Sequence, residues 1–356
     1  MRASASVLTI FASLLAVPCA AQEAGVALTD APAAGAAEAR FVTWDNDSWF
    51  ETDRYYTNGI QFSSRTTEDA RGDFTRRWTG AACRWLGCGD ARFLFSQHSV
   101  GQLMVTPSDI TIPVPQPFDR PYAGLLYVER SWLFIDQDEQ AITTLSAQAG
   151  VTGKLSLAEP AQKLFHRIFD RPEPQGWDHQ VGNTLAVLVS AERRSAWPSL
   201  SGALLGDIRL HTAGHWRLAV GNLMSYAAGG VTFTLGKNLP PVSPAPPGIA
   251  NRAAPVDTAC RLRWIQCTVT LGAEVRGMAY NMFLQGRPWR DDPEVRPRRW
   301  VGDLTAGLRM DFPTTRGSDH GPWFAQLRVT RRSGEFRAPV NVPRHTIGSL
   351  TLGVEF

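Results

Sequence analysis

Residues 265–276, with the sequence IQCTVTLGAEVR, alternate between apolar and mostly polar side chains. Residues 304–311 and 323–330 show the same alternation. A repeat of two predicts β-strands that each have one apolar face and one polar, charged face. In the first segment the apolar positions are Ile265, Cys267, Val269, Leu271, Ala273 and Val275.

Strands of this kind suit a soluble β-sandwich, which buries its apolar faces, or a transmembrane barrel, which turns them outward to lipid. Three features favour the barrel over the sandwich. The strands approach the length of about 9–11 residues that a tilted membrane strand needs. The chain ends on a strand whose last residue is Phe356, as outer-membrane barrels commonly do. Aromatic residues also stand at many strand ends, as in an interfacial girdle: Trp44, Phe93, Trp132, Trp264, Trp300 and Trp323.

The pattern therefore predicts an all-β, antiparallel, transmembrane outer-membrane barrel of roughly twelve strands over residues 39–356. The expected strands are 39–47, 57–66, 93–106, 122–136, 141–153, 183–195, 202–214, 224–236, 262–279, 300–312, 321–333 and 345–356. An even number of strands puts both ends of the barrel on the periplasmic side. The outer loops are then 48–56, 107–121, 154–182, 215–223, 280–299 and 334–344.

Composition excludes several other classes. The 356 residues carry a net charge of +3, too balanced for a nucleic-acid partner. An apolar fraction of 44% excludes disorder, and 31 glycines with 24 prolines exclude a coiled coil. After the first 20 residues no apolar run reaches the about 18 residues of a membrane helix.

The first residues are typical of an exported protein. Arg2 precedes an apolar stretch over 7–17 and small residues up to Ala21, which predicts a cleaved signal peptide over 1–21 and a linker over 22–38. A short anchoring helix is the alternative. The remaining cysteines suggest two local disulfides, Cys83–Cys88 and Cys260–Cys267. Zinc is a weaker interpretation, since no histidine stands at ligand spacing beside them.

Polar residues crowd the ends of the strands on the outer side. They fall in residues 45–47 (DND), 53–59 (DRYYTNG), 107–109 (PSD) and 119–124 (DRPYAG). Carboxylate and amide oxygens are ligands suited to Ca²⁺. The alternative is that these residue types only populate turns.

The loop 154–182 contains a candidate helix. Ser156 and Glu159 fit a capping box, and Pro160 suits the first helical turn. Helical spacing then relates Ala161, Leu164, Phe165, Ile168 and Phe169, which predicts a short amphipathic helix over the barrel mouth that touches the outer leaflet.

His166 falls on this helix, beside its apolar stripe. It is either a packing residue or a general base, because imidazole titrates near neutral pH. No G-x-S-x-G nucleophile motif is present. Calcium with a histidine would activate water directly and would suit the hydrolysis of an acyl ester at a membrane surface.

These motifs resemble the LpxR family of outer-membrane lipid A 3′-O-deacylases. The resemblance covers most of the mature chain, with the motifs in family order: 45–48 (DNDS), 52–59 (TDRYYTNG), 119–124 (DRPYAG), His166 and 176–180 (GWDHQ).

The resemblance implies a twelve-stranded barrel that removes the 3′-linked acyloxyacyl group of lipid A in a calcium-dependent reaction. It implies that Asp47 serves the metal-dependent step, that Asn46 and Thr57 support it or bind the metal, and that His166 is the base for water. The alternation from Ile60 and Phe62 places Thr57 on the lumen face.

The chain departs from the family pattern at two points. The best-studied branch has a site lysine after the third strand, where this chain reads SDITI over 108–112, and a glutamate where this chain has Pro172. Arg120, beside Asp119, or Arg171 is a candidate to take the place of the lysine.

The partners expected are lipid A or lipopolysaccharide and outer membrane lipids, in a Gram-negative outer membrane with the site at the outer-leaflet side. Two alternatives stay open, namely a non-catalytic pore or lipopolysaccharide-binding barrel and an outer-membrane phospholipase. Glu129, Glu274 and Arg276 fit a network that fills the lumen better than they fit catalytic roles.

Overall fold

The structure is a computed structural model that describes residues 38–50, 54–205, 208–237, 239, 242, 260–262, 265–290, 292, 294–312, 322–339, 342 and 344–356. These residues belong to one compact unit. The predicted signal peptide, and the predicted linker except for its last residue, lie outside the described residues.

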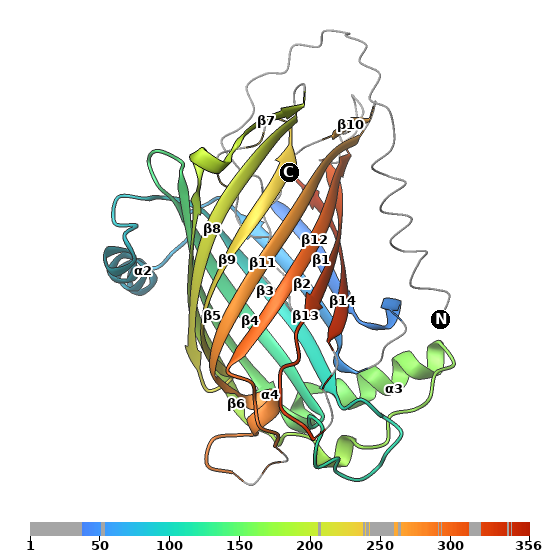
Figure 1. Cartoon of the computed structure of the whole chain (residues 1–356). Helices are drawn as coiled ribbons and strands as arrows, with labels where there is room; N and C mark the ends of the chain where they lie inside the picture. Colours follow the sequence, from blue (N-terminus) through green and yellow to red (C-terminus); the bar gives the residue numbers. More distant parts are fainter. Residues whose placement is uncertain are drawn as a thin grey trace. The chain divides into compact units, whose positions relative to one another are not determined.

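Twelve antiparallel strands form a closed barrel, as the alternation predicts (Figure 1). The first and last strands pair with each other, from Ala39 opposite Glu355 to Asn46 opposite Gly348. The barrel strands are β1 (Ala39–Asn46), β2 (Tyr55–Thr66), β3 (Arg92–Thr106), β4 (Ala123–Ile135), β5 (Ala141–Thr152), β6 (Leu185–Ala196), β8 (Ile208–Gly221), β9 (Met224–Gly236), β11 (Ile265–Asn281), β12 (Trp300–Phe312), β13 (Trp323–Arg332) and β14 (His345–Glu355). Two short strands, β7 (Gly202–Leu205) and β10 (Cys260–Leu262), pair with β8 and β11.

The prediction for the seventh strand was wrong in its bounds. The strand expected at 202–214 is β8, which runs to Gly221, so the outer loop expected at 215–223 shrinks to a turn at residues 222–223. Arg217 and His215 look like loop residues in the sequence, but both side chains are buried in the barrel. Charged residues that face a polar lumen are easily taken for loop residues in the sequence, although they belong to a strand.

The faces of the strands are those of a barrel and not of a sandwich. Large apolar side chains such as Phe62, Val100 and Val128 are exposed on the outside of the wall. Threonine, serine and charged side chains alternate with them and are buried inside. Among the described residues, no helix is long and apolar enough to cross a membrane.

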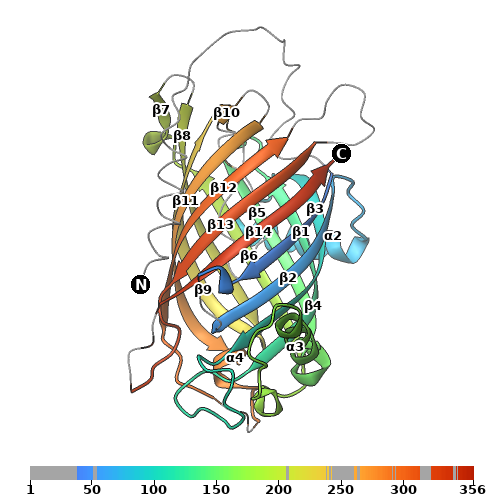
Figure 2. The ribbon, with the colours of Figure 1, turned by 90° about the vertical axis from the view of Figure 1, so that its right-hand side faces the viewer.

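Three α-helices occur in the described residues: α2 (Asp73–Leu86), α3 (Ala158–Ile168) and α4 (Met282–Gln285). The helix α3 is the one that the sequence predicted, whereas α2, between β2 and β3, was not expected. The two lie at opposite ends of the barrel, with α2 at the end where the terminal strands β1 and β14 begin and end (Figures 1 and 2).

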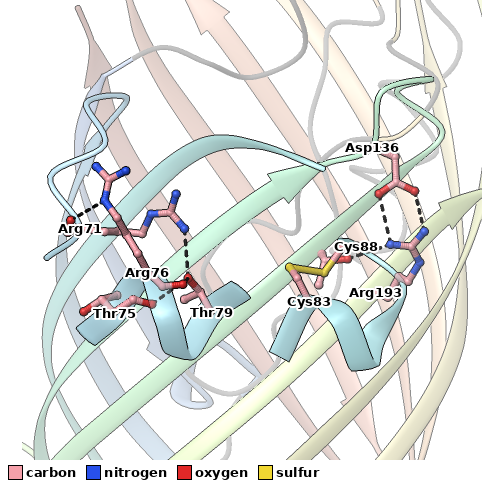
Figure 3. Close-up of a disulfide and its surroundings, with 9 residues drawn as sticks. Arg71, Thr75, Arg76, Thr79, Cys83, Cys88, Asp136 and Arg193 are labelled. Carbon is pink, nitrogen blue, oxygen red and sulfur yellow. Dashed lines mark hydrogen bonds and ion pairs between the residues drawn. A yellow bond between two sulfur atoms is a disulfide. The ribbon is translucent and has the colours of Figure 1, made fainter. Parts of the chain in front are cut away.

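The disulfide Cys83–Cys88 is present at the end of α2 (Figure 3). The backbones of Cys260 and Cys267 pair directly opposite each other. Their side chains lie outside what the structure describes, so the second disulfide stays a prediction.

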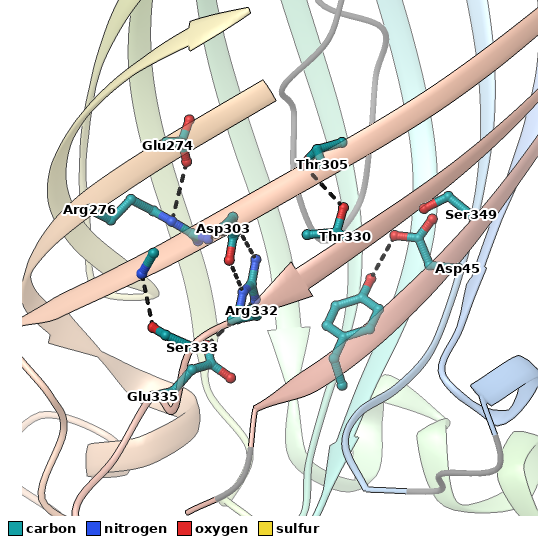
Figure 4. Close-up of polar contacts among 12 residues, drawn as sticks. Asp45, Glu274, Arg276, Asp303, Thr305, Thr330, Arg332, Ser333, Glu335 and Ser349 are labelled. Atoms are coloured by element: carbon teal, nitrogen blue, oxygen red, sulfur yellow. Dashed lines mark hydrogen bonds and ion pairs between the residues drawn. The ribbon is translucent and has the colours of Figure 1, made fainter. Parts of the chain in front are cut away.

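A chain of ion pairs crosses the lumen. Glu192 accepts from Arg194 at 3.0 Å and from Arg217 at 2.6 Å, and Arg217 also lies 3.3 Å from Glu274. The series continues through Arg276, Asp303, Arg332 and Glu335 to Arg120, as Figure 4 shows in part. This confirms the predicted filling role for Glu274 and Arg276, while Glu129 accepts a hydrogen bond from Ser131 at 3.1 Å.

Candidate active site

The first candidate residues stand at the C-terminal end of β1. Because strand residues alternate, Thr43 and Asp45 turn into the lumen, and Asn46 turns to the outside of the wall with Trp44. Asn46 lies opposite Asn58 of β2 and donates to its side-chain oxygen at 3.3 Å. The side-chain oxygen of Asn46 accepts the backbone N–H of Ser48 at 2.7 Å, which fixes the amide at the surface of the wall.

Thr57 occupies a bulge, and the bulge changes its direction. The pairing of β2 with β3 shifts between Tyr56 and Asn58, so Thr57 is the extra residue. Its hydroxyl lies 2.6 Å from that of Thr106, and its side chain lines a pocket with Asn46 on the outer wall. The expectation that Thr57 faces the lumen was wrong, since simple alternation does not continue through a bulge.

Asp47 is fully buried next to Asn46. One carboxylate oxygen, Oδ2, accepts the backbone N–H of Arg54 at 2.8 Å. The residue thus holds the turn between β1 and β2, and its side chain does not line the pocket in this conformation.

The helix α3 packs against the outside of β3 and β4 and not over the barrel mouth as expected (Figure 2). Its buried residues Ala158, Gln162 and His166 are spaced by four and face the wall. Gly124 of β4 permits the contact, because a methyl group there would overlap the side chains of Ala158 and Ser156. Of the predicted apolar stripe, Leu164, Ile168 and Phe169 are exposed, whereas Ala161 and Phe165 are half-buried.

The expected capping box is absent. The residue before the helix is Leu157, in a left-handed conformation with φ 57°, and its side chain makes no capping hydrogen bond. The Ser156 hydroxyl accepts the backbone N–H of Ala158 at 3.4 Å, and not that of Glu159 as a capping box requires. The Ser156 hydroxyl donates to the carbonyl of Gly153 at 2.6 Å instead, and the carbonyl of Ser156 accepts from Gln102 of β3 at 2.7 Å. These bonds tie the start of α3 to the wall, while Pro160 lies in the first turn as predicted.

His166 is 2% exposed and points from α3 toward the wall. Its Nδ1 lies 2.6 Å from the backbone carbonyl oxygen of Pro172. A carbonyl oxygen only accepts, so Nδ1 carries the proton and Nε2 carries the lone pair. This is the tautomer that a general base requires. Pro172, at the position where the family pattern has a glutamate, orients the ring through its backbone.

The pocket brings three predicted residues together. It encloses about 260 Å³ of space, open solvent at its mouth included. Among the described residues that line it, Arg171 alone carries a fixed positive charge, and it follows the helix that carries His166. The lining residues are Asn46, Ser48, Thr57, Asn58, Met104, Gln162, Phe165, His166 and Arg171.

Asp119 and Arg120 lie elsewhere. Asp119 accepts from the backbone N–H of Ser108 at 2.8 Å and closes the loop that follows β3. Arg120 is buried and donates to Glu335 at 3.0 Å, at the outer end of the lumen chain. Of the two arginines proposed for the missing lysine, the pocket therefore contains Arg171.

The loop residue Asp109 also has a structural role. Its carboxylate accepts from the hydroxyl and the backbone N–H of Thr111, at 2.7 and 2.9 Å. These hydrogen bonds hold the pKa of Asp109 below its usual value. Asp109 therefore stabilises a turn, in agreement with the alternative that these residue types populate turns.

The motif over residues 176–180 packs against α3 through Trp177. The indole of Trp177 is fully buried and donates to Gln162 at 2.8 Å, and its ring centre lies 4.8 Å from that of Tyr122. Gln162 and Trp177 were not predicted as site residues. The helical spacing of Gln162, four residues before His166, was the signal in the sequence that could have indicated it.

In the described part of the chain, no group of three or more His, Cys, Asp and Glu side chains could hold a metal ion. The oxygens near His166 nevertheless match Ca²⁺ in type, since Asn46, Thr57 and Asp47 offer an amide, a hydroxyl and a carboxylate oxygen. The Asp47 side chain does not line the pocket, so it would have to turn toward it to join the other two.

Comparison with known proteins shows which family the chain belongs to. The family model of "Outer membrane protein LpxR" matches residues 8–356, which is nearly the whole chain. The chain belongs to the LpxR family. Its barrel is thus that of an outer membrane protein, and the resemblance seen in the motifs is confirmed.

Among solved structures, LpxR from Salmonella typhimurium aligns with a TM-score of 0.68 at 16% identity, over 89% of this chain and 100% of that one. It shares the fold of this LpxR-family chain. The β domain of the Bordetella autotransporter BrkA has a TM-score of 0.42 at 10% identity, over 90% of this chain and 100% of its own. The translocator domain of NalP from Neisseria meningitidis has 0.41 at 8%, over 90% and 88%. No curated protein sequence matches.

Proposed function

We propose that the chain is a lipid A deacylase that hydrolyses the ester of the 3′-linked acyloxyacyl chain. The observation that carries this proposal is the pocket on the outer wall, where α3 places His166 opposite Asn46 and Thr57. Membership in the LpxR family supports the same reaction class.

His166 is the general base of the proposed reaction. Its Nε2 takes a proton from water, and the hydroxide attacks the carbonyl carbon of the ester. Collapse of the tetrahedral intermediate breaks the bond to the sugar oxygen, and the imidazolium returns its proton to that oxygen. The Pro172 carbonyl keeps the ring oriented throughout. General base catalysis of this kind contributes about 10²–10⁴-fold in rate.

Arg171 is the residue proposed to bind the anionic part of the substrate. A guanidinium binds phosphate through paired hydrogen bonds, and lipid A carries phosphate. Its place in the pocket lining suits a phosphate near the reacting ester.

We also propose that the reaction depends on Ca²⁺, held by Asn46, Asp47 and Thr57. The bound cation would supply positive charge where the ester carbonyl oxygen becomes negative. Asn46 and Thr57 already line the pocket. Asp47 would turn toward the pocket and add the one negatively charged ligand of the set, so its carboxylate should contribute strongly to the affinity for the ion.

The position of the pocket suits a lipid substrate. It lies on the outside of the wall, and beside it α3 exposes Leu164, Ile168 and Phe169. A lipid in the membrane could therefore enter sideways without crossing the lumen. The pocket is at the end of the barrel opposite the terminal residues of the sheet, and we propose that this end faces the outer leaflet.

Mass spectrometry of lipid A from outer membranes that contain the protein tests the proposal. Lipid A should lose the mass of the 3′ acyloxyacyl group in membranes that contain the wild type or the control variant His179→Ala. His179 is an exposed histidine outside the pocket. The acyloxyacyl mass should persist with His166→Ala and with the size-conserving His166→Gln. Heat-modifiable migration in gels would establish that each variant is folded.

Two further arms separate the alternatives. Calcium depletion should stop the reaction, and Asp47→Asn should weaken Ca²⁺ binding in calorimetry, a readout that does not depend on activity. Phospholipid offered beside lipid A would reveal a phospholipase. An unchanged lipid A spectrum with folded wild-type protein would refute the deacylase. Ion conductance without ester hydrolysis would then favour the pore.

A further inference from the structure

The helix α2 lies on the lipid-facing side of the barrel wall. Cys83 and Cys88 pack with Trp132, Phe134 and Leu145 of β4 and β5. Trp132 and Phe134 alternate with the lumen residues Ser131 and Leu133, so they point outward. The helix therefore covers the wall where the barrel meets lipid, at the end opposite the candidate active site (Figure 1).

Several contacts hold α2 in this place. The guanidinium of Arg71 lies 4.7 Å from the ring centre of Phe93 and 5.0 Å from that of Phe134, and it donates to Thr79 at 3.0 Å (Figure 3). The disulfide closes the other end, where Gly87 adopts φ 76°. One face of the helix is thus attached to the barrel at both ends.

A flank of α2 next to the wall-facing residues exposes large aromatic side chains. Phe74 is 82% exposed and Trp85 is 91% exposed. On a helix of 3.6 residues per turn, Phe74, Ala81 and Trp85 fall within about 40° of one another. They form one continuous apolar flank beside the wall-facing residues.

The rest of the exposed face carries two arginines and, in the first turn, Asp73. Arg77 and Arg84 lie within about 20° of each other on the wheel and adjoin the apolar flank. Both are exposed. Arg76, by contrast, donates to the backbone oxygens of Arg71 and Asp69 at 2.9 and 3.1 Å, so it serves the local fold.

An apolar flank next to a basic flank, beside a lipid-facing wall, fits a lipid–water interface and not bulk water. The aromatic rings would reach the acyl region, and the guanidiniums would meet the phosphates above it. The position on the wall sets the depth, because α2 lies near the end of the strands.

We propose that α2 binds anionic phospholipid in the leaflet opposite the active site. Phe74 and Trp85 insert among the acyl chains, and Arg77 and Arg84 bind the phosphate headgroups. The helix would fix the barrel in the membrane at its periplasmic end, independently of the reaction proposed above.

The full-length protein in nanodiscs of brominated phosphatidylcholine tests the insertion. Emission of Trp85, obtained by subtracting the spectrum of Trp85→Phe from that of the wild type, should fall by roughly half or more with bromine in the acyl chains. Aqueous iodide should leave that emission unchanged. Emission quenched by iodide and not by bromine would overturn the proposal.

The headgroup contact is tested by placing the protein in nanodiscs of equal phosphatidylglycerol and phosphatidylcholine and then extracting it in detergent. Mass spectrometry counts the lipids that stay bound to the extracted protein. The wild type should retain more phosphatidylglycerol than Arg77→Gln/Arg84→Gln, by about fivefold or more. Arg337→Gln/Arg344→Gln, which changes exposed arginines at the other end, should equal the wild type. Equal retention by all three proteins would overturn this part of the proposal.

Discussion

The lumen of the barrel and the pocket on its outer wall both bury polar groups, but they pair them differently. In the lumen Glu192, Asp303 and Glu335 each meet at least one arginine, and Glu274 meets both Arg217 and Arg276 at 3.3 Å. In the pocket His166 and Arg171 lie among neutral oxygens, and no carboxylate belongs to the described lining.

The difference separates structure from chemistry. Ion pairs that satisfy one another leave little capacity for a substrate, and the loss of one partner leaves the other charge buried and less well paired. A histidine held by a carbonyl and an arginine beside amide oxygens can still exchange a proton or bind an anion. The number of buried charges in the lumen is therefore a poor guide to the active site.

The largest expected effect comes from breaking the lumen chain. Arg217→Met leaves Glu192 and Glu274 buried without their shared cation. We expect a loss of about 3–5 kcal/mol in the free energy of unfolding, measured by urea titration in micelles, because two buried carboxylates lose a shared cation and keep only one arginine each. Activity per folded molecule should stay near that of the wild type.

Arg193→Met is the matched control, since Arg193 of β6 pairs with Asp136 at 2.6 Å in a partly exposed position (Figure 3). It should cost at most about 1 kcal/mol. Equal losses in the two variants would show that the lumen chain contributes no more than a surface pair.

The next effect concerns the pH dependence of the stability at Glu335, in the same series of lumen ion pairs. Burial raises the pKa of Glu335, but the charges of Arg332 and Arg120 outweigh it and lower the pKa to about 2. A lowered carboxyl pKa stabilises the fold above the ordinary value of 4.5, and this contribution is lost as the pH falls toward 2.

Urea titrations at pH 6 and pH 3 should therefore show a smaller loss of stability with acid for Glu335→Gln than for the wild type. The slope that Glu335 adds is at most about 1.4 kcal/mol per pH unit. Parallel pH profiles of the two proteins would contradict the role of this ion pair.

The smallest effect is expected at the pocket itself. Arg171→Gln should lower kcat/KM for lipid A by about tenfold, mostly through KM, because one charge-assisted contact to phosphate is lost. Stability should not change, since the side chain is exposed. Arg167→Gln, in the last turn of α3 and paired with Glu173 at 2.9 Å, should keep full activity. A tenfold loss in both variants would show that the effect comes from the positive charge of this surface in general, and not from a specific contact of Arg171 with phosphate.

Several features of the site could be predicted from residues near one another in the chain. The spacing of the apolar residues predicted a helix that carries His166, and motif resemblance pointed to Asn46 and Thr57. The direction of Thr57 was missed, because a bulge moves a side chain to the other face without a clear sign in the sequence. The choice between Arg120 and Arg171 was also open, since it depends on which way two loops turn.

The sequence by itself determined the barrel, because period-two alternation follows from the pleat of each strand and needs no distant partner. It determined the helix α3 for the same local reason, through its spacing of 3.6. Only the tertiary structure decided that α3 packs on the wall and not over the mouth, since that requires Gly124 of β4 beneath Ala158. It alone joined Asn46, Thr57 and His166, which three separate elements contribute, and it alone placed α2 against the outside of the barrel wall.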